Sequence, residues 1–219
     1  MTNAQAPFGT VLTAMATAFK PDGSLDIEAI QRVAKHLIAH GHDGIVVSGT
    51  TGESPTTTIA EDGQIFRAVR EAVGPDVTLV AGIGTNDTST TLELAAQAEA
   101  NGADALLLVS PYYSKPGQAG LLNHFKQVHD ATTTPIMLYD VPGRTGTKIS
   151  ADSYREMAGW GRVVAVKDAA GDATQAAFLT ELGYVVYSGD DALTLASSPT
   201  VPSGWSPWSV TPLATRSAP

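Results

Sequence analysis

Short apolar runs alternate with amphipathic stretches along most of the chain. Each run is rich in Val, Ile, Leu or Ala and ends at a polar or glycine-containing turn, which is typical of a buried strand. Between the runs, apolar residues recur at helical spacing; Ile30, Ala34 and Leu37 form one such stripe. The pattern predicts seven strands, at residues 10–19, 44–48, 77–83, 105–109, 135–139, 163–167 and 185–188.

Capping residues mark where several of the helices begin. Ser24 is the candidate cap of the first helix, because acidic residues and then an apolar stripe follow it. Thr58 and Glu61 have the spacing of a capping box, and Asp172 and Gln175 have it more loosely.

Alternating strands and helices predict an α/β fold with a parallel sheet. Strands that are apolar on both faces are buried on both faces, and serial right-handed crossovers give either a doubly wound sheet or a closed barrel. Polar residues follow nearly every predicted strand, whereas a doubly wound sheet gathers them at one switch point. We therefore predict a barrel of about seven parallel strands, whose functional face lies at the strand C-termini.

Composition excludes several classes of protein. The chain has 219 residues, a formal charge of -9 and a pI near 4.8, which argue against a nucleic-acid partner. Without cysteine there is no disulfide, thiol nucleophile or cysteine metal site. The N-terminus lacks the pattern of a signal peptide, and no apolar run has the length of a membrane span. We expect a cytoplasmic protein without a membrane partner.

Lys167 ends an apolar run, and lysine is rarely buried without a reason. Desolvation lowers the pKa of a lysine, so that a free amine near neutral pH attacks a ketone to form a Schiff base. The alternative is an ion pair with Asp168 or Asp190. The strand alone leaves both interpretations open.

Other polar groups after the predicted strands also admit two interpretations. The segment 50–52 is either a tight loop or a set of hydroxyls and backbone N–H groups for a small anion. Tyr113 and Tyr139 either pack against neighbouring residues or carry protons during catalysis. Arg144 pairs either with Asp140 or with a substrate carboxylate.

Two motifs suggest cofactors but lack the residues that those sites require. Gly82-Ile83-Gly84 begins like a dinucleotide fingerprint, yet no third glycine follows at the required spacing. His36 and His40 have the spacing of a zinc pair, but no third ligand is evident. We expect no cofactor and no metal.

Five motifs in register resemble the dihydrodipicolinate synthase family, which are pyruvate-dependent class I aldolases of lysine biosynthesis on a (β/α)8 barrel. The likeness runs from about Gly9 to Leu195. The Pro-x-Arg-Thr-Gly segment favours the synthases over the related N-acetylneuraminate lyases and 2-keto-3-deoxygluconate aldolases. The motifs occupy residues 49–53, 110–113, 139–146, 166–168 and 188–191.

The resemblance implies a lyase that condenses pyruvate with L-aspartate 4-semialdehyde to give 4-hydroxy-tetrahydrodipicolinate. Lys167 would form the Schiff base, and Tyr139 would move protons to and from it. Thr50 would connect Tyr139 to Tyr113, which would reach in from a neighbouring subunit of a homotetramer.

The resemblance also implies a set of substrate-binding residues. Thr51 would hold the pyruvate carboxylate, Arg144 the carboxylate of aspartate semialdehyde, and Gly189 would lie beside the substrate. In the family's lysine-feedback site the usual histidine and glutamate are replaced by Ile59 and Thr90, which argues against feedback inhibition.

Composition changes after Leu195, which divides the chain into a barrel domain (1–195) and a tail (196–219). The tail contains five prolines, six serines and three threonines, a composition that predicts disorder. The family continues instead with an apolar helix, an eighth strand and a C-terminal helical region, so we interpret the tail as an out-of-frame or truncated C-terminus. The resemblance then implies an incomplete (β/α)8 TIM barrel with about seven strands. This leaves an alternative function as a non-catalytic, subunit-like partner.

Overall fold

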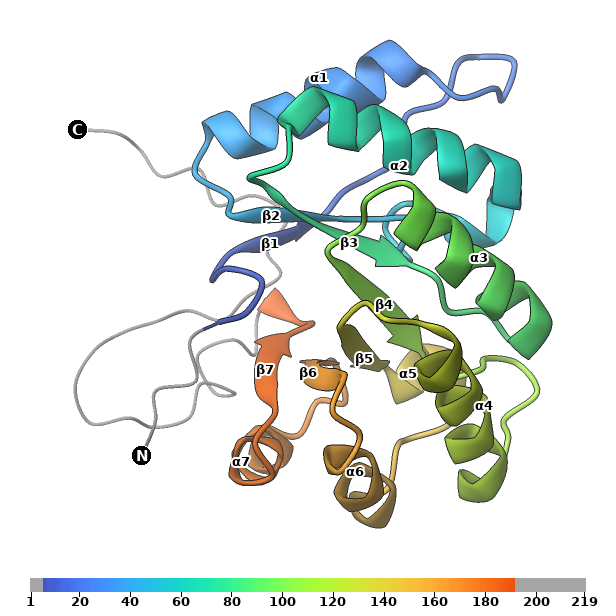
Figure 1. Cartoon of the computed structure of the whole chain (residues 1–219), viewed down its shortest axis with the longest axis vertical. Helices are drawn as coiled ribbons and strands as arrows, with labels where there is room; N and C mark the ends of the chain where they lie inside the picture. Colours follow the sequence, from blue (N-terminus) through green and yellow to red (C-terminus); the bar gives the residue numbers. More distant parts are fainter. Residues whose placement is uncertain (1–5, 192–219) are drawn as a thin grey trace.

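In a computed structural model of the chain, which describes residues 6–191, seven parallel strands pair strictly in sequence order. They form an arc with the helices along its outer side (Figure 1). This confirms the predicted α/β barrel architecture, and the tail predicted at 196–219 lies outside the described residues. The strands are β1 (Leu12–Ala14), β2 (Gly44–Val47), β3 (Thr78–Gly82), β4 (Ala105–Val109), β5 (Ile136–Asp140), β6 (Val163–Asp168) and β7 (Val185–Ser188).

Each crossover between consecutive strands contains a helix. Two shorter turns, the 3-10 helix η1 (Ser54–Thr56) and α5 (Pro142–Thr145), lie in the loops after β2 and β5. Within residues 6–191, no helix is long and apolar enough to span a membrane. The longer helices are α1 (Ile27–Ala39), α2 (Ile59–Val73), α3 (Thr88–Ala100), α4 (Gln118–Ala131), α6 (Ala151–Ala158) and α7 (Ala173–Glu181).

The strands are apolar on both faces because each face meets a different core. In β2, Ile45 and Val47 belong to the large cluster between the strands and the helices. Val46, between them, belongs to a smaller cluster inside the arc. The same alternation in β5 places Leu138 in the outer layer and Tyr139 inside, so a residue's position along its strand decides which core it joins.

The helix caps agree only in part with the sequence prediction. Thr58 and Glu61 form the predicted capping box. The first helix is capped by Asp26, whose carboxylate accepts from the Ala29 N–H, rather than by Ser24. Asp172 caps α7, but Gln175 does not complete a box because its side chain turns into the protein instead.

The first strand is shorter than predicted. Residues 10–19 were expected to be extended, whereas β1 covers only Leu12–Ala14. The chain bends after β1, where the Thr17 hydroxyl donates to the Gly52 carbonyl over 2.7 Å. This bond holds the segment that follows β1 against the loop that follows β2.

β1 and β7 each pair on one side only within the described part of the chain. A side chain nevertheless joins the two ends of the sheet. The Tyr187 hydroxyl accepts from the Phe8 N–H at 3.3 Å and donates to the Gly9 carbonyl at 3.1 Å. Tyr187 is fully buried and its ring stacks with Phe8, so β7 is tied to the segment that leads into β1.

Candidate active site

A cavity of about 340 Å³ lies at the C-terminal ends of the strands. Predicted site residues from three different loops or strands line it: Thr50 after β2, Tyr113 after β4, and Tyr139 and Arg144 from β5 and α5. Sequential parallel strands bring these loops to one face, as the barrel prediction requires.

Lys167 is not among the described residues that line this cavity, but it lies over the ring of Tyr139, which does line it. The two residues are register partners on β5 and β6, and the lysine Nζ is 4.6 Å from the centroid of the ring. Lys167 is 7% exposed, and burial lowers the pKa of its amine from 10.5 to about 8. The charge of Arg144 lowers this pKa further and that of Asp191 opposes it. A larger share of the nucleophilic free amine is therefore present near neutral pH than for an ordinary lysine.

A bulge in β6 decides that Lys167 points inward. Ile136 pairs with Val163 but Met137 pairs with Ala165, so Val164 is the extra residue. Val163 packs in the outer core, whereas Val164 and Ala165 both contact the inner one. If residues 163–167 alternated strictly, with no bulge at Val164, Lys167 would lie on the same side as Val163 and face the helices.

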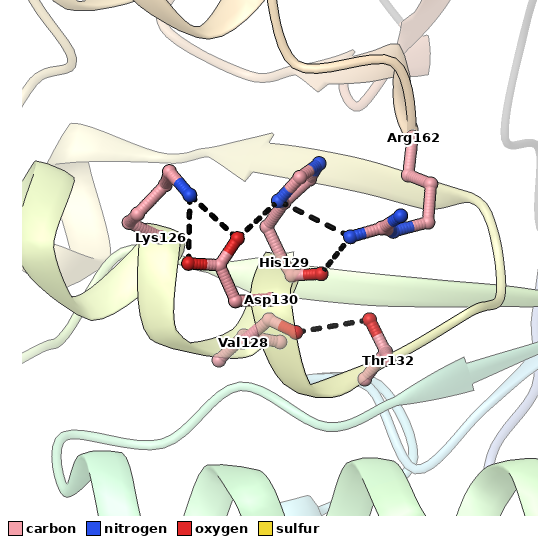
Figure 2. Close-up of polar contacts among 6 residues, drawn as sticks. All are labelled: Lys126, Val128, His129, Asp130, Thr132 and Arg162. Atoms are coloured by element: carbon pink, nitrogen blue, oxygen red, sulfur yellow. Dashed lines mark hydrogen bonds and ion pairs between the residues drawn. The ribbon is translucent and has the colours of Figure 1, made fainter.

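The segment that enters the bulge is anchored to the end of α4 (Figure 2). Arg162 donates through Nη2 to the His129 carbonyl. The His129 Nδ1 lies 2.9 Å from Asp130 Oδ1, and Lys126 Nζ bonds both Asp130 oxygens at 2.5 and 2.7 Å. The start of β6 is thus held at the N-terminal end of the sheet, far along the strand from Lys167.

Asp168 does not pair with Lys167. Neighbouring strand residues point to opposite faces, so Asp168 faces the helix layer. Its Oδ1 accepts from the Ala170 N–H at 2.9 Å and from Gln175 Nε2 at 3.2 Å. The ion-pair interpretation is therefore wrong for Asp168.

Tyr139 is 6% exposed, and this burial raises the pKa of its phenol. The nearby Thr50 hydroxyl and the charge of Arg144 oppose this rise in the pKa. The phenol is therefore protonated at neutral pH and has a hydroxyl partner at the cavity wall, an arrangement suited to proton exchange with a bound molecule.

Tyr113 and Thr51 have different environments. Tyr113 is 87% exposed at the rim of the cavity and has a left-handed backbone with φ of 71°, which is uncommon for an aromatic residue. Thr51 is exposed and is not among the described residues that line the cavity.

Asp140 is fully buried and faces the helix layer, so the predicted alternative that Arg144 pairs with it is wrong. The Asp140 carboxylate accepts from the Tyr154 hydroxyl at 3.0 Å, from Gln175 Nε2 at 3.2 Å and from the Ile149 N–H at 3.4 Å. Burial raises the pKa of Asp140 to about 6. This network did not emerge from the sequence, although an aspartate at an outward position of a buried strand was a signal for it.

The glycines of the dinucleotide-like motif have a structural explanation. A Cβ on Gly82 would lie 2.1 Å from the Ser48 carbonyl oxygen, and one on Gly84 would lie 2.5 Å from the Val109 nitrogen. Both positions require glycine because neighbouring strand ends approach closely. The rings of His36 and His40 lie 3.9 Å apart, tilted by 36°, and both residues are on the exposed side of α1. Residues 6–191 contain no group of three or more side chains that could hold a metal ion.

Gly189 packs against the backbone and side chains that surround Lys167. A Cβ there would lie 2.8 Å from the Ala169 Cβ and 3.3 Å from the Lys167 Cε. Gly189→Ala is expected to displace the lysine and to slow its reaction with a ketone by about 100-fold, as misplacement by roughly 1 Å does. The rate of borohydride-trapped adduct formation measures this effect.

Gly120→Ala is the matched control for that substitution. Its added Cβ would meet only the Pro116 Cβ, at 3.5 Å, on the helical segment α4. It should leave the trapping rate unchanged. Equal rates in both variants would show that Gly189 does not constrain the lysine.

Comparison with known proteins gives one consistent result. A family model described as the dihydrodipicolinate synthetase family matches residues 7–205. A 4-hydroxy-tetrahydrodipicolinate synthase of Acidothermus cellulolyticus is 58% identical over 193 residues, which is 87% of this chain and 62% of that protein.

Solved structures agree with the sequence comparison. A dihydrodipicolinate synthase from Bacillus anthracis superposes with a TM-score of 0.84 at 42% identity, over 87% of this chain and 66% of that one. A chloride-inhibited dihydrodipicolinate synthase from Acinetobacter baumannii, complexed with pyruvate, superposes with a TM-score of 0.83 at 36% identity, over 87% of this chain and 66% of that one. The chain thus spans just under two thirds of the length of these relatives.

Proposed function

Because the chain belongs to the dihydrodipicolinate synthetase family, we propose that it carries the Schiff-base chemistry of a 4-hydroxy-tetrahydrodipicolinate synthase. The proposed reaction joins pyruvate to L-aspartate 4-semialdehyde. The observation that carries the proposal is the buried Lys167 amine, whose pKa of about 8 leaves it reactive and which lies 4.6 Å from the centroid of the Tyr139 ring.

In the proposed first step, the free amine of Lys167 attacks the ketone carbon of pyruvate. Loss of water gives a protonated imine, which withdraws electrons from the adjacent methyl group. The methyl group then loses a proton to form an enamine, and the enamine carbon attacks the aldehyde of the second substrate. Burial favours this sequence because it keeps a fraction of the amine uncharged before pyruvate arrives.

Proton transfer in these steps is assigned to Tyr139, with Thr50 as its hydroxyl partner. The support is that both residues line the cavity, that Thr50 influences the phenol, and that the raised pKa keeps the phenol protonated between transfers. We propose that Tyr113 completes the relay in a neighbouring subunit of a homotetramer, since an 87% exposed tyrosine is free to project from this chain. Sedimentation of the purified chain measures its oligomeric state.

Substrate binding is assigned to three further residues. Arg144 lines the cavity and offers a planar pair of donors to the carboxylate of aspartate semialdehyde. Thr51 is proposed to hold the pyruvate carboxylate, through the hydroxyls and N–H groups of the 50–52 loop. Gly189 leaves room for the imine beside Lys167.

Borohydride trapping tests the proposal directly. The purified chain is incubated with pyruvate and sodium borohydride, digested, and mapped by mass spectrometry. We expect one adduct, on Lys167. An adduct on a different lysine, or none in a sample that unfolds cooperatively, would remove the assignment.

A second measurement separates this activity from related aldolases. Turnover is compared for three substrates: aspartate semialdehyde with pyruvate, N-acetylneuraminate, and 2-keto-3-deoxygluconate. The 58% identity to a synthase favours the first. Turnover of either sugar acid alone would reassign the chain within the Schiff-base aldolases.

A further inference from the structure

The buried carboxyl groups behind the reactive pair have no role in the chemistry above. Asp140 and Asp168 are register partners, one residue beyond the partners Tyr139 and Lys167. We propose that Asp140 is a positioning residue: linked to Asp168 through Gln175, it fixes the strand ends that hold Tyr139 against Lys167. This inference rests on the proposed function of Lys167 as the Schiff-base residue.

The geometry of the link is specific. Gln175 Nε2 lies 3.2 Å from Asp140 Oδ2 and 3.2 Å from Asp168 Oδ1, so one amide group bridges two adjacent strands. Gln175 is 8% exposed, and both aspartates are buried as well. A buried amide that donates to two carboxylates has little freedom to move, because a shift away from either one leaves a buried N–H of the amide without an acceptor.

Three separate elements converge on Asp140. Tyr154 donates from α6, Gln175 from α7, and the Ile149 backbone from the loop between α5 and α6. The Tyr154 backbone is itself held in place, since the Tyr184 hydroxyl donates to the Tyr154 carbonyl at 2.8 Å. Hydrogen bonds from the helix layer to Asp140 therefore fix the end of β5.

Other charged groups influence the network electrostatically but are not part of its hydrogen bonds to Asp140. Asp168 acts on Asp140 across the strand pair, and Lys148 and Asp172 act on Asp168 from the loop and the cap of α7. On the inner face, Arg144 and Asp191 act on Lys167. The two faces share no direct hydrogen bond among the described residues, so an effect of Asp140 on Lys167 must pass through the backbone of β5 and β6.

That path predicts a measurable effect on the lysine. The pKa of Lys167 is low because Tyr139 and its other neighbours exclude water from it. If the strand ends separate, water reaches the amine and its pKa returns toward the ordinary value. A residue that only stabilised the fold, without positioning the strand ends, would not change the pKa of Lys167.

Competitive labelling of Lys167 with fluorodinitrobenzene across a pH range, read by peptide mass spectrometry, tests the proposal. The native chain should show a labelling midpoint near pH 8. Asp140→Leu, which removes all three acceptor bonds, should raise the midpoint by about one unit. Asp140→Asn keeps one oxygen as an acceptor for Tyr154 and Gln175, so its labelling midpoint should stay near that of the native chain.

Two further variants keep the test decisive. Gln175→Met removes only the two bonds that bridge Asp140 and Asp168, and it should also raise the midpoint. This variant tests the proposal even if Asp140→Leu does not fold. Arg70→Met is the control: it removes bonds to the Gly74, Val77 and Gly102 carbonyls at the opposite face and should leave the midpoint unchanged.

The results separate this proposal from the proposed function. A folded Gln175→Met or Asp140→Leu chain with an unmoved midpoint would overturn the positioning role, and so would an equal rise in Arg70→Met. A raised midpoint in a chain that never traps pyruvate would support the positioning role while removing the Schiff-base function. Labelling needs no substrate, so the two outcomes are independent.

Discussion

Replacing Lys167 by methionine is expected to abolish the borohydride-trapped pyruvate adduct and to lower condensation activity by at least about three orders of magnitude. Methionine fills similar volume but has no amine, so no imine forms. The adduct is measured by mass spectrometry of the digested chain, and activity by consumption of aspartate semialdehyde.

Lys148→Met is the matched control, because it makes the same change at a lysine that is not buried. Lys148 is half exposed, and its Nζ pairs with Asp172 at 3.6 Å. It should trap pyruvate as the native chain does. Loss of the adduct in both variants would mean that methionine disturbs the fold rather than the chemistry.

The same Lys167→Met substitution should make the chain more stable at neutral pH. The pKa of Lys167 falls from 10.5 to about 8 on folding, so the native state binds this proton less tightly than the unfolded state. The stability that this group contributes is present above pH 10.5 and is lost as the pH falls through 8. At pH 7 the buried amine therefore costs about 3 kcal/mol, which methionine would recover. Urea unfolding of both chains measures it.

Replacing Asp140 by asparagine should change how stability depends on pH. Burial raises the pKa of Asp140 from 3.8 to about 6, so the native state binds the proton more tightly than the unfolded state. Its contribution is fully present below pH 3.8 and is lost as the pH rises through 6. Between about pH 4 and pH 7, the asparagine variant should gain about 3 kcal/mol relative to the native chain.

Urea unfolding of the two chains at both pH values gives this difference directly. Surface carboxylates with lowered pKa values, such as Asp87 and Asp130, change both chains equally and cancel. Parallel stability curves for the native and asparagine chains would contradict a titrating Asp140.

The strands were predictable because both of their faces are apolar. The predicted run at 105–109 coincides with β4 and that at 185–188 with β7. The longest predicted run, 10–19, was wrong beyond Ala14, where the chain leaves the sheet and Thr17 bonds to the loop after β2. A hydroxyl partner on another loop leaves no local pattern in the sequence.

The sequence identified Lys167 but not the reason that it lies on the inner side of the sheet, against Tyr139. Apolar residues at 163–166 suit either core, so nothing local shows that Val164 is a bulge. The pairing of β5 with β6 decides this, and pairing is a tertiary property. The Asp140 network was missed for a related reason: its partners Tyr154 and Gln175 lie 14 and 35 residues away and meet only when the helices pack.

The order of the sheet bears on how the chain folds during its synthesis. Every strand pairs with the strand that precedes it in sequence, so each βα unit finds its docking edge already formed when it leaves the ribosome. The sheet can therefore be extended one unit at a time from the N-terminus. The Tyr187 bonds to Phe8 and Gly9 are the exception, since they join residues 179 and 178 positions apart. These bonds form only after β7 has been made, and until then the segment before β1 lacks its buried tyrosine partner.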